Sequence, residues 1–250
     1  MTTPELAVIP IGVGAAYART GEVQSSYLVR AGDTTLCLDL GAGALNALQA
    51  HVRPQDVDAY VISHRHPDHC VDVLPLHVYM YWGPGRGTRA RVLSPVGVEG
   101  RLKALGSETG WDDALRFEPV HGGSVVHVDD VRLRFAEVPH IPDTLAVRVD
   151  HGRRSLVYGA DCTENEALVK LAKGADLLIA ECGDGPTPNA LSPHMSGGEA
   201  GGIAARAKVK QLLLTHCFPE HDRDATIAAA RAACPNIPVE WAIQGRLYPV

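Results

Sequence analysis

Apolar segments of the length of β-strands, separated by turn residues, recur along the first two thirds of the chain. Three segments rich in Val, Ile and Leu, separated by Gly and Asp, lie near the N-terminus at residues 6–13, 25–30 and 34–40. Further short apolar segments lie at residues 58–63, 90–93, 145–149 and 155–158, and several more alternate within residues 117–140. Short segments of this kind, separated by turn residues, predict sheets in which many neighbouring strands are joined by hairpins.

Helical spacing of apolar residues predicts short helices at residues 41–51 and 96–105 and dominates the last third of the chain. There, helices predicted at residues 166–174, 200–207 and 224–233 alternate with strands at 176–180, 211–215 and 239–243. Thr163 with Glu166, and Ser196 with Glu199, have the spacing of a capping box at a helix start. With no repeat and no linker-like stretch, the pattern predicts one α/β domain over residues 1–250.

Composition and charge exclude several classes of protein. The chain has 250 residues, of which 46% are hydrophobic and 21% charged, enough for a full globular core. It has no apolar run of roughly 20 residues and no signal-peptide layout at its start, so we expect a cytoplasmic protein that binds no membrane. A net charge of −6 argues against long nucleic acid as a partner. The six cysteines occur without a C-x-x-C pair and predict reduced, mostly buried thiols.

Histidine is the unusual component of the sequence. The chain has 12 histidines, and His64, His66 and His69 lie within six residues, together with Asp68. His64 and His66 are two positions apart, so in an extended backbone both project to one side and can share a metal ion. Asp68 and His69 follow a proline, where the chain bends, and can turn toward a second ion. A chance histidine-rich loop and a purely structural metal site are the alternatives.

The string HRHPDH at residues 64–69 matches the H-x-H-x-D-H motif of the metallo-β-lactamase superfamily, which the chain therefore resembles. The later ligands of that family have counterparts in the same order, His140, Asp161 and His216, each at the predicted end of a strand. Residues 155–163 are similar to the family's Y-S-G-D-T segment, with a cysteine inserted after the aspartate. The resemblance implies an αββα sandwich of two mixed sheets flanked by helices.

By this resemblance the protein binds two divalent metal ions. The first ion would be held by His64, His66 and His140, the second by Asp68, His69 and His216, and Asp161 would bridge them. Imidazole and carboxylate ligands without thiolate suit Zn²⁺, which is the default, and also Mn²⁺ or Fe²⁺. Water between two such ions loses a proton near neutral pH and becomes a nucleophile, which Asp68 would orient. Taken singly, His140 or His216 would more often be a hydrogen-bonded core or surface histidine, but their position at strand ends in the family's order favours a metal ligand.

The segment PHMSGGEAG at residues 193–201 narrows the resemblance to the tRNase Z-like branch. In that branch a histidine just before such a helix contacts the phosphate or protonates the leaving group, which makes His194 the candidate for these roles. The alternative for His194 is a surface loop residue. Residues 37–41, which include a counterpart of the family's buried structural aspartate in Asp39, and residues 68–70 look closest to short bacterial atypical cyclic-nucleotide phosphodiesterases. The long basic arm with which tRNA-processing members grip tRNA is missing.

These observations predict a metal-dependent hydrolase with Asp68 and His194 as catalytic residues. The first hypothesis is a phosphodiesterase that acts on a cyclic nucleotide or another small phosphodiester. The same ligands serve hydrolases of lactones, thioesters and other carboxyl esters, an alternative favoured by the scarcity of Lys and Arg near the motifs. An iron-dependent redox protein or a metal-bound binding module is the non-hydrolytic alternative. We expect a small-molecule substrate as partner, and a homodimer stays open.

Overall fold

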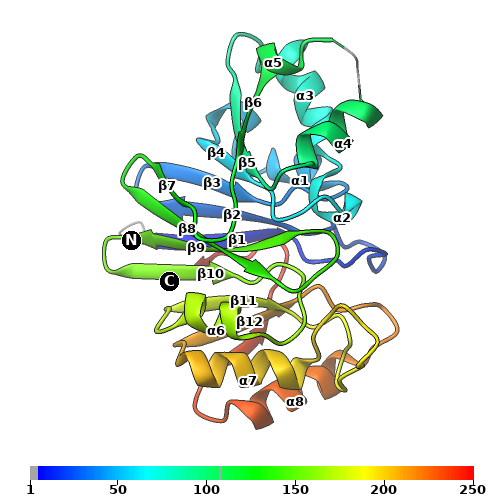
Figure 1. Cartoon of the computed structure of the whole chain (residues 1–250), viewed down its shortest axis with the longest axis vertical. Coiled ribbons are helices and arrows are strands. Elements are labelled where there is room, and N and C mark those ends of the chain that lie inside the picture. The colour runs from blue at the N-terminus through cyan, green and yellow to red at the C-terminus, as the bar shows by residue number, and fades with distance from the viewer. Residues whose placement is uncertain (1–4, 107–108) are drawn as a thin grey trace.

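Two sheets of seven strands each face one another in the computed structural model, which describes residues 5–106 and 109–250. The first sheet has the strand order β14-β1-β2-β3-β4-β5-β6 and the second β13-β12-β11-β10-β9-β8-β7. Figure 1 shows helices α1 to α5 beside the first sheet and α6 to α8 beside the second. Both sheets combine parallel and antiparallel pairs, so the predicted αββα sandwich of two mixed sheets is confirmed.

The elements have the following bounds. The first sheet contains β1 (Leu6–Gly12), β2 (Ser26–Ala31), β3 (Thr34–Leu38), β4 (Ala59–Val61), β5 (Ala90–Ser94), β6 (Leu115–Pro119) and β14 (Tyr248–Pro249). The second contains β7 (Val125–Val128), β8 (Val131–Val138), β9 (Thr144–His151), β10 (Arg154–Tyr158), β11 (Leu177–Glu181), β12 (Gln211–Thr215) and β13 (Val239–Trp241). The helices are α1 (Ala44–Leu48), α2 (Pro67–Cys70), α3 (Val73–Tyr81), α4 (Val98–Leu105), α5 (Trp111–Ala114), α6 (Glu166–Ala172), α7 (Gly197–Ala207) and α8 (Arg223–Ala233), and Pro54–Asp56 form a 3₁₀ turn.

Three hydrophobic layers hold this arrangement together. One lies between the sheets, one between the first sheet and its helices, and one between the second sheet and α6 to α8. Central strands are therefore covered on both faces, and β3 and β11 are buried at every position. This explains why such strands have continuous rather than alternating hydrophobic sequences. The six cysteines are free and buried, as expected from their scattered positions.

Local sequence signals were right at some helix starts and wrong at others. Ser196 and Glu199 form the predicted capping box at the start of α7. The capping box expected for Thr163 and Glu166 is wrong, because the Asn165 side chain caps α6 by accepting a hydrogen bond from the backbone N–H of Leu168. The helix expected at residues 41–51 is shorter and spans only Ala44–Leu48. Among the described residues, no helix combines the length and the apolar character that crossing a membrane requires.

Candidate metal centre

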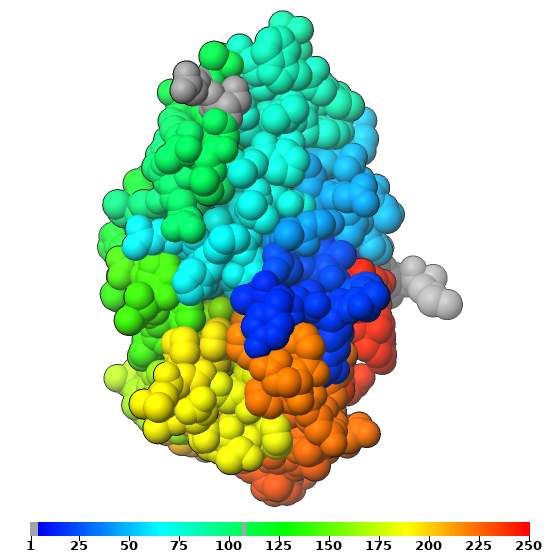
Figure 2. Space-filling model, turned by 90° about the vertical axis from the view of Figure 1, so that its right-hand side faces the viewer, coloured from blue at the N-terminus to red at the C-terminus, as the bar shows by residue number. Residues whose placement is uncertain are grey.

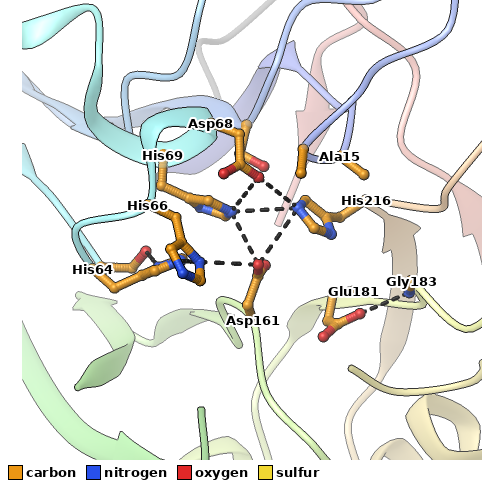
Figure 3. A network of polar contacts seen from close by, with 12 residues as sticks. Ala15, His64, His66, Asp68, His69, Asp161, Glu181, Gly183 and His216 are labelled. Atoms are coloured by element: carbon orange, nitrogen blue, oxygen red, sulfur yellow. Dashed lines mark hydrogen bonds and ion pairs between the residues drawn. The ribbon is translucent and has the colours of Figure 1, made fainter. Parts of the chain in front are cut away.

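Loops that follow four strands bring the predicted ligands together at one edge of the sandwich. The segment after β4 carries His64 and His66, and α2, which follows directly, carries Asp68 and His69. The second sheet supplies the remaining three from the loops after β8, β10 and β12: His140, Asp161 and His216. In Figure 3 the side chains from both sheets converge on Asp161. Residues up to 152 positions apart in the sequence thus meet because neighbouring strands end at the same edge.

Three strand ends are redirected by a residue in the left-handed backbone conformation. Asp39 has φ 57°, Ala160 has φ 54° and His216 has φ 53°. None is glycine, so each conformation costs of order 1 kcal/mol and needs support from its surroundings. The His216 backbone is held by a hydrogen bond from its N–H to the Val13 carbonyl at 3.0 Å. Such strain concentrated at one sheet edge is typical of a functional site.

The predicted ligands form two groups that share Asp161. The open group is His64, His66 and His140, and the buried group is Asp68, His69 and His216. In the open group, His66 Nδ1 lies 3.1 Å from His64 Nε2 and 3.3 Å from His140 Nε2. In the buried group, His216 Nε2 lies 3.3 Å from His69 Nε2 and 3.2 Å from Asp68 Oδ2.

These spacings fit a metal ion in each group. Tetrahedral zinc with bonds of roughly 2.0–2.1 Å separates its ligand atoms by roughly 3.3 Å. Asp161 lies between the groups: its Oδ2 is 3.2 Å from His69 Nε2 and 3.5 Å from His216 Nε2, while Oδ1 is buried and has no hydrogen-bond partner among the described residues. A buried carboxylate oxygen without a partner is costly unless a cation satisfies it. The residues present therefore suit a centre of divalent metal ions.

Asp39 organises the side of the imidazoles that faces away from the centre. Its Oδ2 accepts hydrogen bonds from His69 Nδ1 at 2.7 Å, from the Tyr158 hydroxyl at 2.7 Å and from Ser63 Oγ at 2.8 Å. Ser63 Oγ in turn lies 3.0 Å from His64 Nδ1. A partner on one ring nitrogen fixes the orientation of the imidazole and leaves the other nitrogen free for a metal. Asp39 is fully buried, in agreement with its resemblance to a structural aspartate.

His194 stands beside both groups, just before α7. Its Nδ1 is 2.9 Å from Glu181 Oε1 and 4.0 Å from Asp161 Oδ2. Glu181, the last residue of β11, also accepts hydrogen bonds from the backbone N–H groups of Cys162 at 3.1 Å and Gly183 at 2.7 Å. The sequence analysis missed Glu181, which continues the strand predicted at residues 176–180. A carboxylate at the carboxyl end of a buried strand was the available signal.

The surroundings of Asp68 and His194 shift the pKa values of these two groups in opposite directions. Burial opposes the charge on Asp68, but hydrogen bonds from His216 and His69 outweigh it and hold the pKa of Asp68 far below its usual value. Burial likewise opposes protonation of His194, yet the adjacent Glu181 raises the pKa of His194 to about 9. Near neutral pH the site thus contains a charged Asp68 carboxylate and a protonated His194 imidazole.

The fold and this set of side chains define a metallo-hydrolase. The model of the beta-lactamase superfamily domain matches residues 36–217, and the chain belongs to that family. An uncharacterized protein of Mycobacterium leprae is 36% identical over 235 residues, covering 90% of this chain and 82% of the relative. The probable metallo-hydrolase YhfI of Bacillus subtilis is 30% identical over 220 residues, covering 86% of this chain and 89% of the relative.

One further finding agrees with the tRNase Z-like branch and another with the fold. A ribonuclease Z of Mycolicibacterium gilvum is 29% identical over 238 residues, covering 84% of this chain and 83% of the relative. The crystal structure of YhfI, a metallo-beta-lactamase fold protein, superposes with a TM-score of 0.88 at 26% identity, covering 98% of this chain and 99% of that one.

Proposed function

We propose that this protein is a phosphodiesterase that hydrolyses a cyclic nucleotide or another small phosphodiester at a centre of two metal ions. The observation that carries the proposal is the position of the His194–Glu181 pair beside two ligand groups joined by Asp161. Metal ions held by the two groups would act as Lewis acids and would supply a hydroxide nucleophile at neutral pH. The likeness to a ribonuclease Z, an enzyme named for cleavage of RNA, supports a phosphodiester as substrate.

His194 would protonate the leaving group. Glu181 Oε1 accepts the Nδ1 proton, and Glu181 is in turn held by two backbone N–H groups, so the imidazole has a fixed orientation. Within the part of the chain that the structure describes, His194 Nε2 has no hydrogen-bond partner, and the side chain is 12% exposed. An Nε2–H without a protein partner can donate to a phosphate oxygen or to the departing alkoxide.

Asp68 would serve as metal ligand and as the group that orients the nucleophile. Its Oδ2 faces His69 Nε2 at 3.3 Å and His216 Nε2 at 3.2 Å. With its pKa far below the usual value, Asp68 stays a carboxylate over the whole neutral range and can accept a hydrogen bond from an attacking water.

The test is the dependence of His194→Ala on the leaving group, at equal metal content. General acid help is worth about 10²–10⁴-fold, so turnover of a phosphodiester with an alkoxide leaving group should fall by that order. Turnover of a nitrophenyl phosphodiester should fall much less, because nitrophenolate departs without a proton. His127→Ala is the matched control, since His127 is exposed on β7.

Two outcomes would contradict the proposal. One is an equal loss with every leaving group, which would make His194 a structural residue. The other is a wild-type protein that cleaves a lactone or thioester far faster than any phosphodiester. That result would support the carboxyl-ester alternative, in which the carbonyl needs polarisation by a Lewis acid more than a proton donor.

A further inference from the structure

Next to the metal centre lies a stacked pair of aromatic rings that the hydrolytic chemistry does not use. Phe218 follows two residues after His216, and its ring centroid lies 5.3 Å from that of His194 and 6.0 Å from that of His216. Tyr17, from the loop between β1 and β2, stacks on Phe218 with centroids 4.9 Å apart and an angle of 22° between the rings. The Tyr17 side chain is 56% exposed, so much of its surface is open to solvent.

The loops that carry these rings are tied to each other. Arg19 donates hydrogen bonds through Nη2 to the carbonyls of Phe218 at 3.4 Å, Pro219 at 3.1 Å and His221 at 2.7 Å. The Tyr17 hydroxyl donates to Glu220 Oε1 at 2.7 Å. In Figure 2 the dark-blue segment of the β1–β2 loop lies directly against the orange segment that follows β12. The aromatic pair is therefore held in place before a substrate arrives, which lowers the entropy that binding must overcome.

The pair extends away from the metal centre, beginning at the ring of His194. The Phe218 side chain is in contact with His194, which leaves Tyr17 one ring further from the metal centre. In a nucleotide the base is likewise separated from the phosphate, because the ribose lies between them. Exposed aromatic rings bind bases by stacking, which tolerates different bases because every base has a π face. Within the structure as described, Tyr17 contacts no other ring than Phe218.

We infer that Tyr17, backed by Phe218, binds the base of a nucleotide substrate by stacking. The inference rests on the proposed function, because it adds the substrate class to the same site. Tyr17 is a binding residue in this account and takes no part in bond cleavage. Base stacking on an aromatic side chain raises affinity by about 5- to 150-fold, and a partly exposed tyrosine belongs at the lower end.

The first experiment compares two phosphodiesters that differ only in the base: a 3′,5′-cyclic nucleotide and the cyclic ribose phosphate without a base. Tyr17→Ala should raise the KM for the nucleotide about 5- to 20-fold, which corresponds to about 1–2 kcal/mol, and leave kcat unchanged. The KM for the base-free substrate should not change. Tyr17→Phe keeps the ring but loses the hydrogen bond to Glu220, and should behave like wild type. Trp82→Ala, which removes an aromatic side chain 65% exposed at the end of α3, is the control.

The second experiment separates this inference from the proposed function. It measures equilibrium binding of a nucleoside 5′-monophosphate to the metal-loaded protein by calorimetry, with no turnover involved. Weaker binding by Tyr17→Ala, with unchanged binding of inorganic phosphate, supports the stacking role even if no phosphodiester is hydrolysed. Equal binding by wild type and Tyr17→Ala, or an equal rise of KM for both phosphodiesters, overturns it and leaves Tyr17 as a loop contact.

Discussion

The two groups of candidate metal ligands differ in their access to solvent and in the partners that support them. Every member of the buried group lies in the interior, and His69 is held by Asp39. The open group contains the half-buried His66, and only its His64 reaches Asp39, indirectly through Ser63. The His140 side chain is fully buried and has Nδ1 at 3.2 Å from the Pro193 carbonyl.

The difference in exposure indicates that the two groups have different functions. His69, His64 and His140 each have a partner on the far side of the ring, whereas His216 Nδ1 is buried without one among the described residues, so the two groups differ in exposure more than in the number of supported rings. A group with a half-buried member can exchange solvent and admit a substrate. His194, with its side chain 12% exposed, lies close to the ring of His140 as well as to that of His216. With one metal ion in each group, as proposed, we expect the buried group to retain its ion longer than the open group.

The largest effect is expected for Asp161, because both groups depend on it. Asp161→Asn keeps the volume of the side chain but removes the negative charge that faces five histidines within 4.0 Å of Oδ2. Metal content should fall in both groups, and turnover should drop by about 10³-fold or more, as when a preorganised charge-stabilising group is lost. Elemental analysis and kinetics measure this. Asp176→Asn, at a buried carboxylate paired with Lys210 far along the sheet, is the control and should retain its metal.

The next effect concerns the stability of the metal-free protein. His69→Ala leaves Asp39 in the interior without its charged partner and should lower the free energy of unfolding by about 3 kcal/mol or more. His66→Ala removes a half-buried side chain whose neighbours are imidazoles, and should cost less than about 1 kcal/mol. Urea unfolding in the presence of chelator measures both. Equal losses would show that the two groups do not differ in support.

The same comparison predicts a dependence on pH. Burial opposes protonation of His69, but Asp161 and Asp39 outweigh it and hold the pKa of His69 well above its usual value. A group whose pKa is raised on folding stabilises the protein fully below its unfolded pKa of about 6.5, and this contribution is lost as the pH rises through the folded pKa. The difference between wild type and His69→Ala should thus be largest in mild acid and should shrink at high pH.

The sequence indicated which side chains meet at the sheet edge better than it indicated the hydrogen bonds around them, for a physical reason. Motif spacing and strand ends are local, so residues 64–69, Asp161 and His216 could be identified from short windows. The Tyr158–Asp39 hydrogen bond and the position of Glu181 depend on how the strands of the two sheets are paired, which no short window contains. Helix α3 was missed because it is apolar on most sides and has Pro75 in its first turn, where a missing N–H costs little.

The smallest effect tests whether Asp39 serves the two groups unequally. Ser63→Ala removes the hydroxyl that links Asp39 Oδ2 to His64 Nδ1, but the hydrogen bonds from His69 and Tyr158 to Asp39 remain. Loss of a partner behind a ligand lowers metal affinity by about 10- to 100-fold. For Ser63→Ala we expect the low end of this range, about 10-fold, because a water molecule can replace the hydroxyl. The loss of metal affinity should affect only the open group. Competition with a chromophoric chelator resolves the release of the more weakly and the more tightly held metal. Ser155→Ala, which removes a buried serine that bonds Asp176 instead, should change neither phase. Asp39→Asn, in contrast, should weaken both phases, since Asp39 supports His69 directly and His64 through Ser63. If Ser63→Ala weakened both phases equally, the two groups would share one support and the division between them would not hold.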